Sequence, residues 1–207
     1  MRWNVDVDHF INAPQQERSI RSHNRILDAA SALLEKAAFE DVSVAQICGR
    51  AKLSTGAFYA RFTSKKAVLY AIQSRYMTRL RADISEALGV AKAQSTPLPD
   101  LARAIFFLIA RGGLATRGVM HAVTSESTRD AHVMMNIADF SADLAATFCA
   151  LEGPEADSSA MAFATRACIA TLQQEWLYPE RMSSEGIDVL ADRLALLLVG
   201  YVKAQRT

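Results

Sequence analysis

The residues whose types and spacing could do chemistry lie in one short stretch of the N-terminal third, and they favour contact with a polyanion. Four small or hydroxyl-bearing residues open an expected helix there: Ser54, Thr55, Gly56 and Ala57. Their size lets the first turn of the helix approach a nucleic-acid backbone, where free N–H groups and the helix dipole favour a phosphate. Arg61 follows closely. Its guanidinium can pair with guanine through two hydrogen bonds or hold a phosphate, and the sequence leaves both roles open.

No catalytic constellation is recognisable elsewhere in the 207 residues. The sequence lacks a nucleophile elbow, a phosphate-binding loop, a metal-ligand cluster and paired carboxylates at catalytic spacing. We therefore expect no enzyme activity, no cofactor and no metal. The cysteines Cys48, Cys149 and Cys168 lie far apart among apolar neighbours. This pattern favours reduced, buried thiols over a zinc site or a disulfide framework.

The chain also lacks the signals of export and membrane insertion. The first twenty residues are polar and include acids, unlike a signal peptide. The longest apolar runs are too short to span a bilayer or are interrupted by Arg103 and Arg111. We therefore expect a cytoplasmic protein with no membrane partner.

Capping signals predict how the first of two short helices is positioned. Ser43 and Gln46 form the capping-box pattern, and Val42 and Ile47 stand at the positions of a hydrophobic staple. The helix that they begin stops near Ala51. Ser43 caps this helix whatever else it does, and a second role at a phosphate stays open.

The second short helix follows a tight turn. Lys52 occupies that turn, after which Ser54 can cap the next helix. Phe58 and Phe62 stand at i and i+4, and we interpret them as core residues rather than DNA contacts. Ser64 can cap a longer helix, which we expect to end at Gly89.

These elements form the arrangement of a helix-turn-helix. A first helix from residue 18 carries apolar residues at three- and four-residue spacing: Leu27, Ala30, Leu34 and Ala37. It is followed by a short helix, a turn, a short helix and a long helix, the order of this DNA-binding motif. We expect a flexible arm (1–17), a DNA-binding domain (18–70) and a helical regulatory domain (71–207).

The rest of the chain is also predicted to be helical. Strand alternation is absent, and turn signals at Gly112–Gly113, Gly153–Pro154 and Tyr178–Pro179 separate apolar-periodic segments. The expected fold class is therefore all-α, with a three-helix head, a larger helical body and about nine helices. The glycine pair at 112 and 113 is expected to break a helix that begins at Leu98.

The basic residues gather in the expected head. Between residues 18 and 66 nine Lys and Arg stand against four acids, whereas the net charge of the whole chain is only +1. A basic segment on a near-neutral chain favours a polyanion contact that is confined to the head. Arg18 and Arg21 precede or begin the first helix, and they could either reach a neighbouring groove or remain solvated.

The N-terminal stretch resembles the DNA-binding head of TetR-type regulators. The resemblance is carried by three segments: RILDAASALL (25–34), FEDVSVAQIC (39–48) and AKLSTGAFYARFTSKKAVL (51–69). Apolar spacing, caps and the Gly-x-Phe-Tyr-x-x-Phe-x-Ser-Lys core fall in register. The chain departs at Ala38 and Lys52, where the family often has glycine. If Lys52 adopts positive φ, the strain is of order 1 kcal/mol.

The resemblance implies roles for further residues. Tyr59 would contact a phosphate through its phenol, and Lys65 would hold the DNA backbone at the start of the next helix. The last two helices would form a four-helix interface with a second subunit. The residues expected there are Ala164, Cys168, Leu172, Leu190, Leu194, Leu197 and Tyr201. The alternative is that these residues form only an internal core.

A ligand pocket is expected among the middle helices. The candidate lining residues are Phe106, Phe107, Met120, His121, Met134, Met135, Phe140 and Trp176, with His132 as a further polar candidate. Apolar residues of this kind also form ordinary cores, so each of them could line a pocket or belong only to the core. A mostly apolar lining would favour a hydrophobic or aromatic small molecule.

The expected function is DNA-binding transcription regulation. The chain would bind a palindromic operator in double-stranded DNA as a homodimer and be released by a small, apolar effector. An alternative is a helical ligand-binding or interaction dimer that does not bind DNA. Activation and repression cannot be distinguished from the sequence, because the difference depends on where the operator lies.

Overall fold

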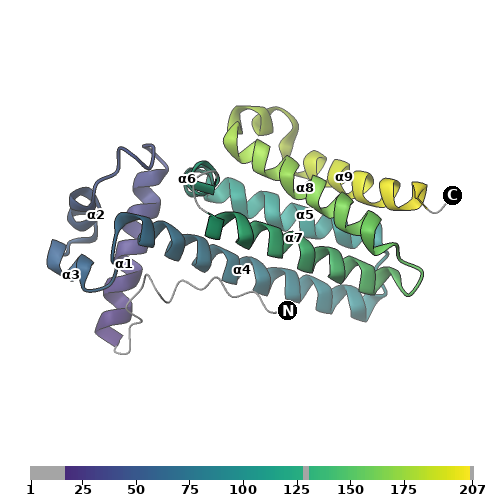
Figure 1. The fold of residues 1–207 in the computed structure, drawn as a ribbon, viewed down its shortest axis with the longest axis horizontal. Helices are drawn as coiled ribbons and strands as arrows, with labels where there is room; N and C mark the ends of the chain where they lie inside the picture. The colour runs from purple at the N-terminus through teal and green to yellow at the C-terminus, as the bar shows by residue number, and fades with distance from the viewer. Residues whose placement is uncertain (1–16, 128–130, 206–207) are drawn as a thin grey trace. The chain divides into compact units, whose positions relative to one another are not determined.

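The computed structural model describes residues 17–127 and 131–205. This part of the chain is helical, without strands, as the sequence predicts (Figure 1). The helices are α1 (Glu17–Leu34), α2 (Val44–Ala51), α3 (Thr55–Tyr59), α4 (Lys65–Gln94), α5 (Leu98–Ala115), α6 (Arg117–Ser127), α7 (Ala131–Glu152), α8 (Ser158–Leu177) and α9 (Pro179–Ala204).

The chain divides into two compact units, which we call the head and the body. The described head contains α1, α2, α3, α4 as far as residue 78, Thr116, and α6 as far as residue 126. The described body contains α4 from residue 79, α5, α7, α8 and α9. The expected boundary at residue 70 therefore falls within α4, and α6 is part of the head although α5 and α7 belong to the body.

The core of the head is built by the apolar stripe of α1 and the two phenylalanines near α3. Ile26 and Leu27 of α1 are fully buried, as is Ile47 of α2. Phe58 and Phe62 are also buried, and their ring centroids lie 5.8 Å apart. The interpretation of both phenylalanines as core residues is confirmed.

The body is held together by contacts among its four complete helices. α5 packs mainly on α9, while α8 packs on both α7 and α9. Phe106 of α5 and Phe148 of α7 are fully buried with their ring centroids 6.1 Å apart. On the surface, Arg103 of α5 pairs with Asp192 and, at 3.0 Å, with Asp188 of α9.

Three glycines expected to end helices lie inside them. Gly89 lies inside α4, and both Gly112 and Gly113 lie inside α5. Packing explains Gly113, because a Cβ there would stand 2.0 Å from Nε1 of Trp176 on α8. The absence of a side chain lets the indole lie on the α5 backbone, which offsets the low helix propensity of glycine.

The last helix contains a kink that the sequence analysis did not anticipate. Gly186 in α9 has φ 76° and ψ 155°, so the backbone leaves helical geometry at this point. A positive φ of this kind is readily adopted only by glycine. None of the helices in the described segments is long and apolar enough to cross a membrane.

Candidate functional site

The predicted capping box begins α2. The Ser43 hydroxyl accepts a hydrogen bond from the Gln46 backbone N–H at 3.2 Å, and the Gln46 side chain accepts from the Ser43 N–H at 2.7 Å. Val42 and Ile47, the staple residues, are both buried. The cap and the staple fix the start of α2 against α1, which confirms this local prediction.

The turn between α2 and α3 is left-handed at Lys52. This residue has φ 52° and ψ 49°, and the Leu53 N–H bonds the Cys48 carbonyl at 3.0 Å. Arg25 of α1 donates to the Lys52 carbonyl at 3.1 Å. The conformation that a glycine would adopt freely is thus forced on a lysine, at a cost of about 1–2 kcal/mol.

The short helix α3 exposes the face that was expected to meet DNA. Ser54 caps it by accepting from the Ala57 N–H at 3.1 Å. Thr55 and Gly56 are exposed, and Tyr59 is 56 % exposed beside the buried Phe58. The first turn is therefore open to an anion, and the Tyr59 phenol stands on the same exposed side of the head.

Arg61 lies after the end of α3 and is half-buried. One of its terminal nitrogens donates to the Ala60 carbonyl at 3.3 Å, while its buried Nε has no hydrogen-bond partner among the described residues. The guanidinium is thus folded toward its own backbone. Reading a guanine would require it to extend, so its base-reading role stays a prediction.

Lys65 has an internal role that the sequence analysis missed. Its ammonium donates to the Phe39 carbonyl at 2.6 Å and to the Glu40 carbonyl at 3.3 Å, and lies 4.4 Å from the centroid of the Phe39 ring. These contacts tie the start of α4 to the loop between α1 and α2. An ammonium has three protons, so a phosphate contact would have to be shared with this loop.

His23 is another residue of the head whose position the sequence did not indicate. It lies on α1, and its ring stacks on Phe62 with centroids 4.9 Å apart. Burial, the Arg75 charge and the Arg61 charge each lower the pKa of His23. Its Nδ1 is buried and lacks a hydrogen-bond partner in the described part of the chain. A positive charge on the His23 ring is therefore disfavoured.

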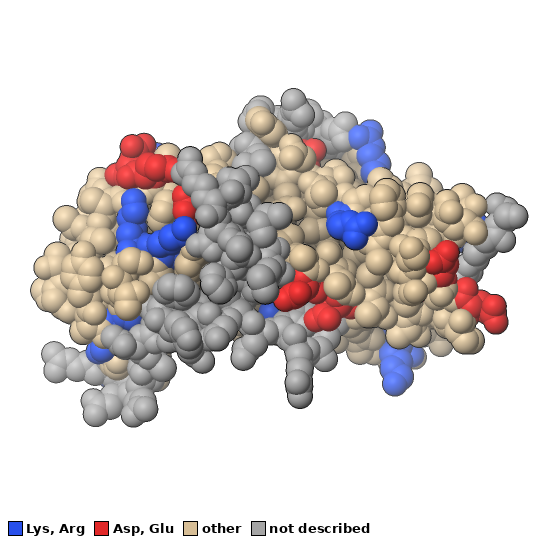
Figure 2. Space-filling view, in the orientation of Figure 1, with Lys and Arg blue, Asp and Glu red and all other residues tan. Residues whose placement is uncertain are grey.

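Charges of both signs lie on the head. Figure 2 shows that, over α1–α3, Lys and Arg side chains on this face stand beside acidic ones rather than in one continuous patch. Arg75 forms an ion pair with Asp28 at 2.7 Å, so one of the positive charges of the head is already neutralised. A polyanion contact by this head would therefore depend on a few well-placed groups more than on a broad field.

Helix α6 is attached to the head at both ends. The Gly118 N–H donates to the Glu35 carboxylate at 3.1 Å, and the same carboxylate lies 3.8 Å from Nε of Arg117. At the other end, Glu126 pairs with Lys66 of α4 at 3.2 Å. No motif signals these contacts, because their partners are far apart in the sequence.

Comparison with known proteins bears on this geometry. Residues 26–72 match the family described as bacterial regulatory proteins, tetR family. This N-terminal stretch, less than a quarter of the chain, is therefore similar to the tetR family. The match covers α2 and α3 and parts of α1 and α4, and hence the exposed face of α3.

Individual relatives extend the comparison. The A-factor receptor protein of Streptomyces griseus is 34 % identical over 58 residues, which are 28 % of this chain and 21 % of that protein. The match thus spans about a fifth of the relative. A TetR-like transcriptional regulator from Rhodococcus sp. RHA1 has a TM-score of 0.66 at 17 % identity, covering 89 % of this chain and 97 % of that one.

A transcriptional regulator from Aquifex aeolicus VF5 is similar to a comparable degree. Its TM-score is 0.61 at 20 % identity, covering 84 % of this chain and 95 % of that chain. At such identities both structures support the fold alone. The fold shared with these two proteins therefore extends through the body, where the sequence showed only helical character.

The residues proposed for the ligand pocket come from both units, and the pocket stays a prediction. Phe106 and Trp176 are buried in the body and Phe107 is half-buried. Met120 is buried and His121 exposed, but both lie on α6 and thus in the head unit. Phe140 is buried in the body. The side chains of His132, Met134 and Met135 lie outside the described residues. A groove that the structure shows in the body, between α4 and α5, has other lining residues.

The residues proposed for the dimer interface divide into two groups. Five are buried within the single chain: Ala164, Cys168, Leu172, Leu190 and Leu194. The Cys168 thiol donates to the Leu194 carbonyl at 3.4 Å, and burial raises its pKa to about 12. Leu197 and Tyr201 are exposed. The internal-core reading thus describes the first group, while the second remains available to a partner.

The exposed apolar face of α8 and α9 includes residues that the sequence analysis missed. Leu196 is 74 % exposed, and Phe163 is also exposed. The Phe163 ring on α8 lies 5.0 Å from that of Tyr201 on α9. Large exposed apolar side chains concentrated on adjacent helices are typical of an interaction surface.

Proposed function

We propose that this chain is a transcriptional repressor that binds a palindromic operator as a homodimer and is released by a small effector. The observation that carries the proposal is the exposed first turn of α3 with Tyr59 beside it, inside the stretch that matches the tetR family. Small residues at that turn permit close approach to DNA, and its free N–H groups favour a phosphate. Ser43, Ser54, Thr55, Gly56, Ala57, Tyr59, Arg61 and Lys65 are the residues proposed to make the contact.

A second copy of the chain is the proposed partner of the α8–α9 face. One head offers only a few base contacts, and two heads related by a twofold axis would double them on one site. The exposed side chains Phe163, Leu197 and Tyr201 support this assembly. A twofold dimer requires an operator with two inverted half-sites.

Release is proposed to work through a shift between two arrangements of the heads. An effector that binds one arrangement more tightly than the other lowers DNA affinity by that difference. α6 is a candidate transmitter, because its ends continue into α5 and α7 while Glu35 and Lys66 hold it to the head. A change that the effector imposes on α5 or α7 would reach the head along the chain.

The experiment is selection of bound duplexes from a random-sequence DNA library at physiological salt, followed by sequencing. A palindromic consensus would support the proposal and give the half-site spacing. Arg61→Ala should relax preference at one position by about 1–3 kcal/mol, while the matched body variant Arg111→Ala should leave the consensus unchanged. Equal loss on specific and random DNA would refute base reading by Arg61.

A helical dimer without DNA binding is the second candidate. The folded-back Arg61 and the internally bound Lys65 favour it, because both cations already have partners in the head. Protein that has been unfolded and refolded to remove a co-purified ligand provides the deciding sample. If this protein is a well-folded dimer and still enriches no sequence, the repressor proposal is wrong.

A further inference from the structure

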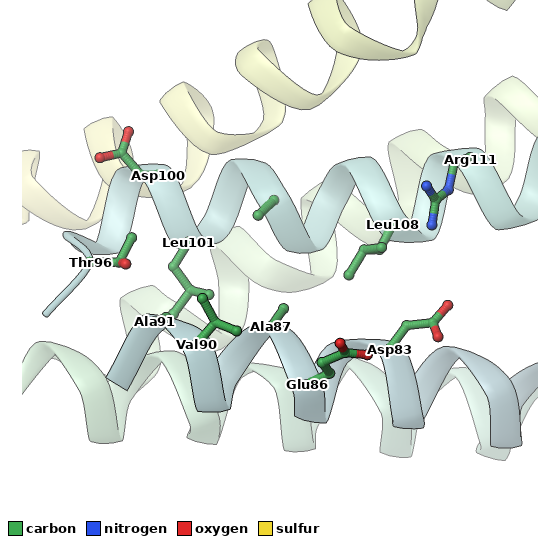
Figure 3. A pocket seen from close by; sticks show the side chains of 11 residues that line it. Asp83, Glu86, Ala87, Val90, Ala91, Thr96, Asp100, Leu101, Leu108 and Arg111 are labelled. Atoms are coloured by element: carbon green, nitrogen blue, oxygen red, sulfur yellow. The ribbon is translucent and has the colours of Figure 1, made fainter. Parts of the chain in front are cut away.

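The body carries an open groove of about 390 Å³ between the second half of α4 and α5 (Figure 3). Its middle is lined by small or branched apolar side chains: Ala87, Val90, Ala91, Leu101, Ala104 and Leu108. Ala91 and Leu101 are buried, whereas Val90 is half exposed at the rim. Alanines on both helices leave room that larger side chains would fill. An apolar group of modest size can therefore lie between the helices.

The charges at the ends of the groove are mostly negative, and its carboxylates have no partner among the described residues. Asp83 and Glu86 lie at one end on α4, and Asp100 lies at the other end on α5 (Figure 3). None of these three carboxylates has a hydrogen bond or ion pair within the described segments. Arg111 is the cation of the lining, and its guanidinium faces the Phe107 ring at 5.6 Å instead of forming an ion pair with a described residue.

Charge complementarity decides what kind of molecule the groove fits. Three carboxylates against one guanidinium leave a net negative lining, which attracts cations and repels anions. The apolar middle gains free energy by covering a hydrocarbon group. An anionic or strongly polar molecule would lack one or both of these interactions.

We propose that this groove binds a small amphiphilic cation, an alkyl- or arylalkylammonium compound, with its ammonium group at Asp83 and Glu86. The hydrocarbon part lies along Ala87, Val90 and Leu108. Binding to this site does not require the proposed DNA-binding function. A role for such a cation as the effector would rest on that function, and it is measured separately.

The test is calorimetric titration of the full chain with octyltrimethylammonium below its micelle concentration. The matched anion is octanesulfonate, which has the same hydrocarbon chain. Saturable binding of one cation per chain is expected, with the anion at least about tenfold weaker and with affinity that falls as salt rises. Equal affinity for the two probes would show adsorption of any amphiphile and would overturn the proposal.

Variants locate the site. The double variant Asp83→Asn with Glu86→Gln should weaken cation binding about three- to tenfold. Asp139→Asn, an exposed acid on α7 outside the groove, should leave it unchanged. Asp100→Asn is a second, independent variant, and thermal unfolding checks that each variant is folded. Unchanged affinity in folded groove variants, or equal loss in Asp139→Asn, would overturn the assignment.

The DNA measurement stays separate from the binding measurement. If the cation binds and also weakens operator binding, it is an effector of the proposed repressor. If the cation binds while no operator is found, the repressor proposal fails and the groove site stands. If an operator is found but the cation does not bind, the groove assignment alone is wrong.

Discussion

Gly118 at the start of α6 lies directly against the backbone of Leu34 at the end of α1. A Cβ at position 118 would stand 2.1 Å from the Leu34 carbonyl oxygen and 2.5 Å from its carbon. The Glu35 carboxylate next in the chain accepts the Gly118 N–H at 3.1 Å. The two helix ends are therefore in contact through backbone, and only glycine leaves the space for it.

Gly118→Ala should destabilise the head, because backbone atoms must move to admit the methyl group. We expect a loss of about 1–3 kcal/mol in the free energy of unfolding, as for other overpacked sites. Urea unfolding followed by circular dichroism measures it.

Gly89→Ala is the matched control within α4. An added Cβ there meets nothing within 4 Å, so the helix should gain up to about 1 kcal/mol from the better propensity of alanine. Similar effects of the two substitutions would contradict the close contact between Gly118 and Leu34.

Lys52→Gly should stabilise the helix-turn-helix. The left-handed φ of 52° at this position is strained for lysine but not for glycine. We expect a gain of about 0.5–1 kcal/mol, since the flexibility of glycine in the unfolded chain offsets part of the relief. The bond from Arg25 goes to the backbone carbonyl and should persist.

Lys52→Ala separates charge from backbone strain. Alanine keeps the strained conformation while removing the ammonium, so its unfolding free energy should not rise above that of the wild type. A gain equal to that of Lys52→Gly would mean that charge, rather than φ, limits stability at this turn.

Lys65→Met should affect both folding and DNA binding. The variant loses the bonds to the Phe39 and Glu40 carbonyls, which should lower stability by about 1–3 kcal/mol. If the ammonium also contacts a phosphate, the slope of log affinity against log salt should decrease by about one unit. Unfolding curves and DNA titrations at several salt concentrations measure the two effects.

Lys36→Met controls for loss of a positive charge from the head, because Lys36 is exposed in the loop after α1. It should leave stability nearly unchanged. If Lys65→Met weakens DNA binding without changing the salt slope, Lys65 acts only by positioning the loop.

The head should lose stability in mild acid through His23. Burial, Arg75 and Arg61 lower the pKa of His23 from 6.5, so below that pH the unfolded chain binds a proton more readily than the folded one. The contribution of the neutral ring is fully present above about pH 6.5 and is lost progressively as the pH falls.

Urea unfolding between about pH 7.5 and 5.5 measures this dependence. His23→Gln should flatten the curve relative to the wild type, whereas His121→Gln on the exposed face of α6 should not. An unchanged slope in His23→Gln would assign the acid sensitivity to other groups.

Leu197→Asp should dissociate the proposed dimer while leaving each chain folded. Leu197 is exposed on α9 within the apolar face that includes Phe163 and Tyr201. Burying a carboxylate without a partner is costly, so the dimer dissociation constant should rise on the order of tenfold or more. Analytical ultracentrifugation gives the constant.

Leu151→Asp provides the comparison, because Leu151 is exposed on α7 and not on α8 or α9. It should leave the dissociation constant unchanged. A wild-type chain that is monomeric at all concentrations, or a dimer insensitive to Leu197→Asp, would contradict the α8–α9 interface.

Interactions between residues close in sequence were readable from the residues themselves. The capping box of Ser43 and Gln46, the cap at Ser54 and the burial of Phe58 and Phe62 depend on neighbours within one or two helical turns. Spacing and side-chain chemistry determine such interactions. The all-α class and the tetR-family resemblance of the head rest on the same local patterns.

Only the tertiary structure decided the features that depend on distant partners. Gly113 stays helical because Trp176 covers it, and Lys65 binds a loop twenty-five or more residues earlier. An apolar stripe on a helix indicates that another element covers it, but the stripe does not identify that element. The sequence therefore could not separate Cys168, which is buried within the chain, from Leu197, which is exposed. The groove between α4 and α5 likewise exists only once these two consecutive helices pack side by side.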